Sequence, residues 1–113
     1  MKHTRLGEFE EVVMLTVGIL YEEAYGVSIK KEIEKRLERK VSVGALQTAL
    51  NRLEKKGYLK SKTGEATQER AGRPKRFFEI TAHGKAALKY TRDTRNDLWN
   101  AIPGLALDLK FHF

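Results

Sequence analysis

The apolar positions between residues 44 and 57 recur with the period of an α-helix. Leu46, Leu50 and Leu53 fall at i, i+4 and i+7, which predicts one apolar stripe along a short helix. The opposite face carries amide, hydroxyl and cationic groups: Gln47, Thr48, Asn51, Arg52, Lys55 and Lys56. Gly57 is expected to end the helix, because glycine accepts the left-handed backbone found just after helices. Such a helix can dock on a core and offer its polar face to a polyanion. The alternative is an ordinary surface helix with a solvated charged face.

Two further helices are predicted before this one. Between residues 6 and 20 the apolar residues follow helical spacing over a broad arc, which is typical of a helix buried on more than one side. A second helix is expected to start at Ser28 or at the glycine before it, with an apolar stripe of Ile29, Ile33 and Leu37. Its other faces are densely charged and are interpreted as solvated. Ser42 is a plausible N-cap for the third helix.

After residue 57 the period of the pattern changes. Residues 58–63 and 75–81 read as strands, and the polar stretch between them, with two glycines and a proline, reads as a hairpin loop. Thr81 is expected to cap a long helix from about residue 82 to 101, which Pro103 stops. In the tail, apolar residues alternate strictly with others, which predicts an extended segment with one apolar face: Leu105, Leu107, Leu109, Phe111 and Phe113.

The predicted fold is mostly α with a small β-hairpin. Three helices followed by a two-stranded ribbon form a winged helix-turn-helix, in which the third helix enters a major groove and the wing touches the adjoining backbone or minor groove. We assign residues 1–81 to a DNA-binding domain, with a wing hairpin at about 58–81. Residues 82–113 then hold a dimerisation helix, at about 82–101, and an apolar C-terminal tail.

Composition narrows the function further. The 113 residues suit one domain, and 22 Lys plus Arg against 15 Asp plus Glu give a net charge of +7. An anionic partner such as the phosphate backbone of duplex DNA is therefore expected. The chain has no cysteine, which excludes disulfides, thiolate zinc sites and cysteine catalysis. It also lacks a long apolar run and a signal-type N-terminus, so no membrane partner and a cytoplasmic location are expected.

Enzymatic and cofactor-dependent functions find no support in the sequence. His3, His83 and His112 are far apart and lack the spacing of metal ligands or a paired carboxylate motif. No nucleophile elbow, phosphate loop or dinucleotide fingerprint is present. No catalytic residue, metal site or cofactor is therefore assigned.

Six short motifs follow one another along the chain. They are Leu6-Gly7-x-x-Glu10, Tyr25-Gly26-x-x-Ile29, Ser42-x-Gly44-x-Leu46, Leu50-x-Arg52-Leu53-Glu54-x-x-Gly57, Gly72-Arg73-Pro74-Lys75 and Ile80-Thr81-x-x-Gly84. Over roughly residues 5 to 90 the chain thus resembles the PadR family of transcriptional regulators. The resemblance implies a homodimeric winged-helix repressor of a palindromic operator, often released by a small molecule. With a single helix after the wing, the chain is similar to the small subfamily, whose final helix makes the dimer interface.

The chain departs from the family pattern at two places. Gln47 stands where the family usually has a tyrosine, which exchanges an aromatic hydroxyl for an amide able to bond adenine edges or phosphate. Operator preference is therefore expected to differ. Tyr58 and Leu59 stand where aliphatic residues are usual, a change expected to affect packing only.

Candidate DNA contacts come from the third helix and from the wing. Those of the helix are Ser42, Gln47, Thr48, Asn51, Arg52 and Lys55. Those of the wing are Arg70, Arg73, Lys75 and Arg76, around a glycine and a proline that shape the loop. In the helix, the amides and the threonine could reach bases or phosphates, while the cations are expected to contact the backbone. For Arg52 the alternative is an ion pair with Glu10 or Glu54, and for the wing it is a solvated tip.

The last helix carries a thin apolar seam near heptad spacing. The predicted dimer interface is Leu88, Thr91, Arg95, Leu98, Trp99 and Ile102. Trp99, the only tryptophan, could stack on a flat aromatic effector at the dimer centre or simply anchor the interface; the anchor is favoured. A second function hypothesis is a small-molecule-binding or protein-docking winged-helix module that reads no DNA, for which the Gln47 departure is the best support.

Overall fold

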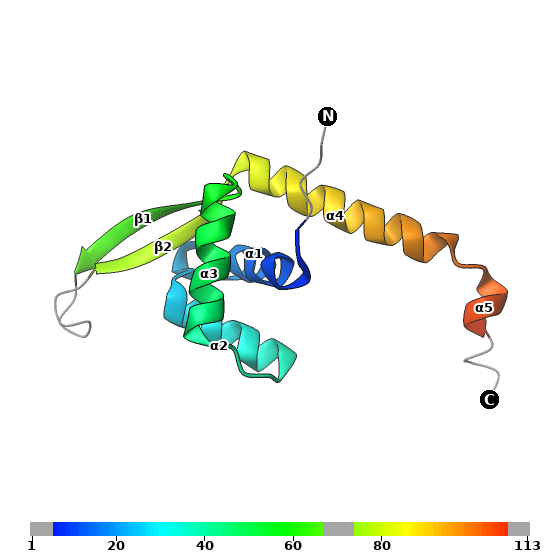
Figure 1. The fold of residues 1–113 in the computed structure, drawn as a ribbon, viewed down its shortest axis with the longest axis horizontal. Helices are drawn as coiled ribbons and strands as arrows, with labels where there is room; N and C mark the ends of the chain where they lie inside the picture. The colour runs from blue at the N-terminus through cyan, green and yellow to red at the C-terminus, as the bar shows by residue number, and fades with distance from the viewer. Residues whose placement is uncertain (1–5, 67–73, 109–113) are drawn as a thin grey trace.

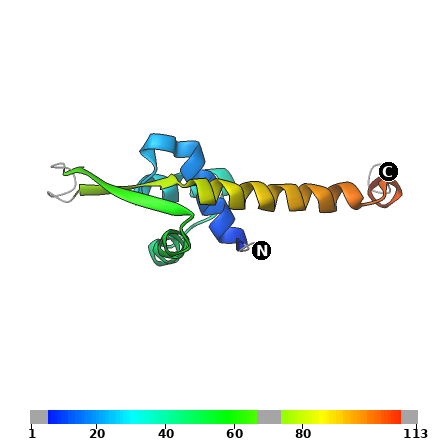
Figure 2. The same ribbon diagram turned by 90° about the horizontal axis from the view of Figure 1, so that it is seen from above.

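The computed structural model describes residues 6–66 and 74–108. The elements are α1 (Glu8–Leu20), the 3-10 helix η1 (Tyr21–Glu23), α2 (Gly26–Leu37), α3 (Val43–Lys55), β1 (Leu59–Ala66), β2 (Pro74–Ile80), α4 (Ala82–Ala101) and α5 (Gly104–Asp108). Helices α1 to α3 gather into one body, the β1–β2 ribbon projects from one side of it, and α4 leaves on the opposite side (Figure 1). Seen from above, the ribbon and α4 follow nearly one line (Figure 2). The order of three helices, hairpin and final helix is the predicted one.

The core lies where the apolar stripes of the first three helices meet the base of the ribbon. The buried apolar residues of the helices are Val13, Met14 and Val17 of α1, Ile29 and Ile33 of α2, and Leu46, Ala49, Leu50 and Leu53 of α3. Tyr58, Leu59 and Phe78 close this core from the ribbon side. Each such large side chain contributes about 1.5–3 kcal/mol by leaving water, so the helical periodicities of the sequence mark the residues that hold the body together.

The helix ends follow the predicted caps. Ser42 Oγ accepts a hydrogen bond from Ala45 N at 3.0 Å, and Thr81 Oγ1 accepts one from Gly84 N at 2.9 Å. Gly57 has φ +81°, the left-handed conformation expected after α3. For α2 the glycine alternative is confirmed, because the helix begins at Gly26.

The ribbon is antiparallel, with Leu59 opposite Ile80 and Ser61 opposite Phe78. Its pairing is irregular between Thr63 and Ala66, and β1 runs three residues further than the predicted strand. Phe78 N donates to Ala24 O at 2.8 Å, so β2 is tied to the segment just before α2. These links fix the root of the wing to the helical body.

The extended tail predicted from the alternating pattern is wrong for residues 104–108, which form the short helix α5. Leu and Ala are strong helix formers, and Ala106 N donates to Pro103 O at 2.9 Å to close the first turn. An extended segment would need a neighbouring strand for its backbone, whereas α5 lies at the far end of α4 from the ribbon (Figure 1). Leu109, Phe111 and Phe113 lie outside the described residues.

Candidate nucleic-acid interface

The polar face of α3 is turned to solvent. The buried leucines of the helix point into the core, and the six residues predicted to contact DNA from this region are all exposed: Ser42, Gln47, Thr48, Asn51, Arg52 and Lys55. The amphipathic pattern alone places them there, since the apolar stripe can be buried only in this orientation. The structure therefore presents amides, a hydroxyl and two cations together along one helix.

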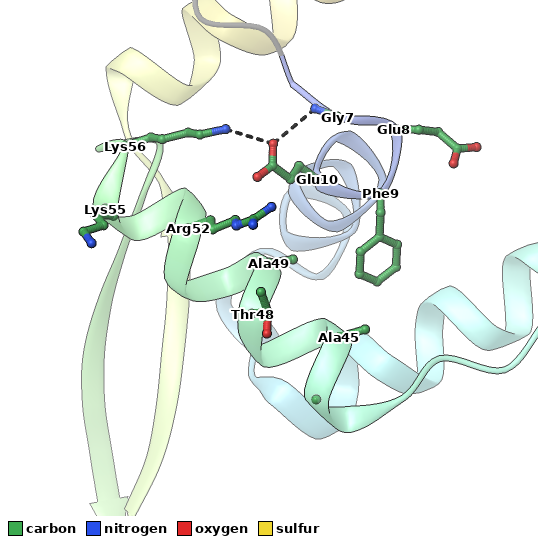
Figure 3. A pocket seen from close by; sticks show the side chains of 11 residues that line it. Gly7, Glu8, Phe9, Glu10, Ala45, Thr48, Ala49, Arg52, Lys55 and Lys56 are labelled. Carbon is green, nitrogen blue, oxygen red and sulfur yellow. Dashed lines mark hydrogen bonds and ion pairs between the residues drawn. The ribbon is translucent and has the colours of Figure 1, made fainter.

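An open groove of about 780 Å³ separates this face from the start of α1. One side is formed by Gly7, Glu8, Phe9 and Glu10, and the other by Gly44, Ala45, Thr48, Ala49, Arg52, Lys55 and Lys56 (Figure 3). Lys55 points away from α1, whereas Arg52 and Lys56 reach across toward it (Figure 3). Around Gly44 the helix surface is open, because a Cβ built there would meet nothing within 4 Å.

Glu10 binds Lys56 rather than Arg52. Its Oε1 accepts hydrogen bonds from Lys56 Nζ at 3.0 Å and from Gly7 N at 3.1 Å. Burial raises the pKa of this carboxyl, but the two hydrogen bonds and the charges of Lys56 and Arg52 outweigh it, so the pKa lies below its usual value. Among the carboxylates of the described residues, none forms an ion pair with Arg52, because Glu10 pairs with Lys56 and Glu54 with Arg76. The ion-pair alternative for Arg52 is therefore not what the structure shows.

The wing cations are divided between different partners. Arg70 and Arg73, predicted to contact DNA, lie outside the described residues. Lys75 Nζ sits 4.2 Å from the ring centre of Tyr25, a cation–π contact. Arg76 pairs with Glu54 of α3 and also donates from Nε to Ser61 Oγ at 3.1 Å. Of the two predicted wing contacts that the structure describes, Arg76 is thus held against α3 by Glu54, which the sequence analysis considered only as a partner of Arg52.

A smaller hollow of about 210 Å³ lies where α2, α3 and the wing meet. Gln47, the departure from the family pattern, lines it together with Tyr25, Gly26, Lys30 and Arg76. The Gln47 amide lies 3.6 Å from the position that a Cβ on Gly26 would take. The amide therefore faces the start of α2 as well as solvent.

Comparison with known proteins identifies the fold and the family. Residues 15–90, more than half of the chain, match the profile described as "Transcriptional regulator PadR-like family". The chain belongs to this family. No curated protein sequence gives a significant match.

Solved structures of transcriptional regulators share the fold of this PadR-family regulator. A PadR-like transcription factor from Bacteroides fragilis is 27% identical with a TM-score of 0.69, over 81% of this chain and 84% of that chain. A transcriptional regulator from Clostridium thermocellum is 25% identical with a TM-score of 0.63, over 84% and 91%. A PadR family regulator from Eggerthella lenta, 23% identical with a TM-score of 0.66 over 88% and 86%, supports the fold alone. The predicted family and the winged-helix fold class are both confirmed.

Two kinds of feature are not found in the described residues of the regulator. They contain no group of three or more His, Asp or Glu side chains placed to hold a metal ion. None of the helices in this part of the chain combines the length and apolar character that a membrane span requires.

The far half of α4 stands away from the body of the regulator. Leu88 packs on the core, Thr91 is partly buried, and the Arg95 guanidinium forms an ion pair of 2.9 Å with Glu11 of α1. Beyond these residues the side chains of the helix are exposed to solvent, and the exposed fraction is 68% for Leu98 and 61% for Trp99. The predicted interface residues therefore separate into an inner group used within the chain and an outer apolar group, which also includes Ile102.

Replacing Glu10 by glutamine is expected to destabilise the regulator by about 1 kcal/mol at pH 7, because a charged acceptor of two hydrogen bonds is lost. The folded-state pKa of Glu10 lies below the ordinary 4.5, so its stabilisation is present above pH 4.5 and disappears as the pH falls through the folded value. Urea unfolding at pH 7 and in acid measures the free energy of unfolding of wild type and variant. The difference between the two should be present at pH 7 and disappear below about pH 4.5.

Glu8→Gln is the matched control, because Glu8 is exposed and forms no ion pair within the described residues. It should leave the free energy of unfolding nearly unchanged at both pH values. A gap for the Glu10 variant that persists unchanged into acid would show that the lost stability does not come from the ionised carboxylate.

Proposed function

We propose that this PadR-family regulator binds duplex DNA sequence-specifically as a homodimer and represses transcription at a palindromic operator. The observation that carries the proposal is the outer face of α3, where amides able to bond base edges and cations able to bind phosphate are exposed together. Within the described residues, neither Arg52 nor Lys55 is paired with an acid, so both charges are available to an anionic partner.

The residues of α3 divide into two roles. Asparagine and glutamine can bond an adenine edge with two hydrogen bonds in the major groove, so Asn51 and Gln47, with Thr48, are proposed to read bases. Arg52 and Lys55 are proposed to bind phosphates, which fixes the helix on the duplex without reading sequence. Ser42 and the wing residues Arg70, Arg73 and Lys75 are proposed as backbone contacts around this helix.

Two copies are needed to read a palindrome. We propose that residues 1–81 bind DNA while residues 82–113 dimerise through the outer apolar group of α4. A two-fold dimer would set its two recognition helices into successive major grooves, about 34 Å apart along the duplex. An effector at Trp99 would need the second copy to enclose its exposed ring. That effector, the direction of regulation and a cytoplasmic location stay predictions.

The proposal is tested by selecting bound sequences from a random duplex pool at moderate salt, then measuring affinity by fluorescence anisotropy. A palindromic consensus is expected, and log K should fall with log salt with a slope of about −0.9 per phosphate contact. Recovery of unrelated sequences with no two-fold symmetry, or an affinity that does not change with salt, would contradict the proposed function.

Two variants distinguish base recognition from phosphate binding. Asn51→Ala should reduce the preference for the selected operator over random duplex by about 1–3 kcal/mol, since one bidentate base contact is lost. Lys55→Ala should weaken binding to both duplexes alike and reduce the salt slope by about 1.8, because each of the two protomers loses one phosphate contact worth about 0.9. Lys85→Ala, an exposed cation at a separate hollow between α1 and β2, is the matched control and should change little. Unchanged discrimination by the Asn51 variant would remove this residue from the base-reading set.

A further inference from the structure

Three side chains close a hydrogen-bonded ring between α3 and the wing. Arg76 Nη2 pairs with Glu54 Oε1, Ser61 Oγ donates to Glu54 Oε2 at 2.5 Å, and Arg76 Nε donates to Ser61 Oγ at 3.1 Å. Both oxygens of the carboxylate are engaged, and the hydroxyl both donates and accepts. We call Glu54, Ser61 and Arg76 the wing clasp.

The register of the ribbon places the clasp on the face turned toward α3. Ser61 is opposite Phe78, and Arg76 precedes Phe78 by two residues, so all three side chains share one face of the ribbon. Phe78 is only 3% exposed and belongs to the core, and the Arg76 guanidinium carbon lies 5.1 Å from its ring centre. The guanidinium is thus packed on an anchored ring, while Glu54 accepts from its Nη2 and Ser61 from its Nε.

The clasp lies near the connection between α3 and the β1–β2 ribbon, the two elements with which a winged helix contacts DNA. Only residues 56–58 separate the end of α3 from the start of β1, and Gly57 lies within that link. Thr81 Oγ1 donates to Gly57 O at 2.6 Å, which secures the base of the ribbon. The Phe78–Ala24 hydrogen bond ties β2 to the segment before α2, and the clasp adds an attachment of the ribbon to α3 itself, which restrains the angle between the ribbon and α3.

We propose that Glu54 is a positioning residue, which holds Arg76 on α3 and so sets the angle of the wing to the recognition helix. Arg76 then serves DNA binding through Glu54 and Ser61 rather than by binding a phosphate itself. This inference rests on the proposed function. It revises the role that the sequence suggested for Arg76, since a guanidinium held by a carboxylate and a hydroxyl has fewer donors left for phosphate.

The change in operator affinity caused by Glu54→Gln distinguishes phosphate binding by Arg76 from positioning of the wing by Glu54. If Arg76 binds phosphate, Glu54→Gln removes a competing acid and should leave operator affinity unchanged or raise it. If Glu54 positions the wing, the same variant should lower operator affinity by about tenfold, as interactions within one hydrogen-bonded network do. Affinity for random duplex should not fall, because the freed Arg76 adds a cation in each protomer and steepens the salt slope by up to about 1.8 for the dimer. A general loss of structure would lower both affinities.

The experiment uses the full chain in a double-mutant cycle of Glu54→Gln, Arg76→Gln and the double variant, measured by anisotropy on operator and random duplexes. The clasp predicts that the double variant is no weaker on the operator than either single variant. Glu79→Gln is the matched control. It removes an acid from the same ribbon, where Glu79 pairs with Lys60 at 3.4 Å away from the clasp, and it should leave operator affinity unchanged or slightly higher.

Additive losses in the cycle, or a Glu54→Gln variant that binds the operator as well as wild type, would overturn the positioning role. The Arg76 Nη2 proton signal in nuclear magnetic resonance spectra provides a readout without DNA, because Nη2 is the nitrogen that pairs with Glu54, and it should shift strongly in Glu54→Gln and not in Glu79→Gln. If wild type binds no duplex, the proposed function fails and this inference fails with it. If wild type binds its operator but the cycle is additive, only the clasp fails.

Discussion

Replacing Gly84 by alanine is expected to destabilise the regulator by about 3 kcal/mol, the upper range for inserting a methyl group into a close-packed site. A Cβ at this position would lie 2.2 Å from Tyr58 O and 3.0 Å from both Ile80 Cγ2 and Met14 Cε. The main obstacle is a backbone carbonyl that also accepts a hydrogen bond from Thr81 N at 3.0 Å, so it cannot turn aside as a side chain could. The first turn of α4 would have to move off the root of the wing.

Gly44→Ala is the matched control for this prediction. Gly44 also lies in the first turn of a helix, but nothing stands within 4 Å of its Cβ position, so alanine should be neutral or stabilising by up to about 1 kcal/mol. Thermal and urea unfolding of both variants would measure the difference. Equal stability of the Gly84 and Gly44 variants would mean that α4 does not approach the Tyr58 carbonyl as closely as the structure has it.

Most of the fold could be predicted because its signals are local. Ser42 and Thr81 cap helices through bonds to residues three positions ahead, and Gly57 marks a helix end by its own backbone. The buried stripes depend only on a 3.6-residue period. Where the signal was short, the prediction failed: alternation near residue 105 describes a strand only if a partner strand exists, and α5 shows that local helix propensity prevails there.

The candidate site also has one part that could be predicted from the sequence and one part that could not. The exposed face of α3 could be predicted, because one amphipathic helix has one face left for solvent. The wing clasp could not, since it needs the register that sets Ser61 beside Arg76 and the approach of that face to Glu54. An acid in the otherwise cationic last turn of α3 was the only trace of it in the sequence. Likewise, the pairing of Glu10 with Lys56 instead of Arg52 depends on the distance between α1 and α3.

Replacing Leu98 by aspartate is expected to convert a dimer into monomers at micromolar concentration and to weaken operator binding by about 100-fold, the effect of losing an interface hot spot of nearly 3 kcal/mol. Leu98 and Trp99 are largely exposed in the single chain, and Ile102 and Leu105, further along the sequence, are exposed as well, with an exposed fraction of 74% for Leu105. Exposed apolar residues gathered on a projecting helix mark an interaction surface, and a second copy is its proposed occupant. Sedimentation velocity and anisotropy would measure the two effects.

The control for this prediction carries the same charge on another face of α4. Asn100 is two residues, or about 200°, around the helix from Leu98, and Asn100→Asp should leave both the dimer and operator affinity close to wild type. Because Leu98 lies beyond the core, the Leu98→Asp chain should keep the circular dichroism of a folded monomer. A Leu98→Asp variant that still sediments as a dimer would mean that other surfaces join the two copies. A variant that becomes monomeric yet binds its operator at full strength would mean that each recognition helix acts alone, and the palindrome would then lose its physical basis.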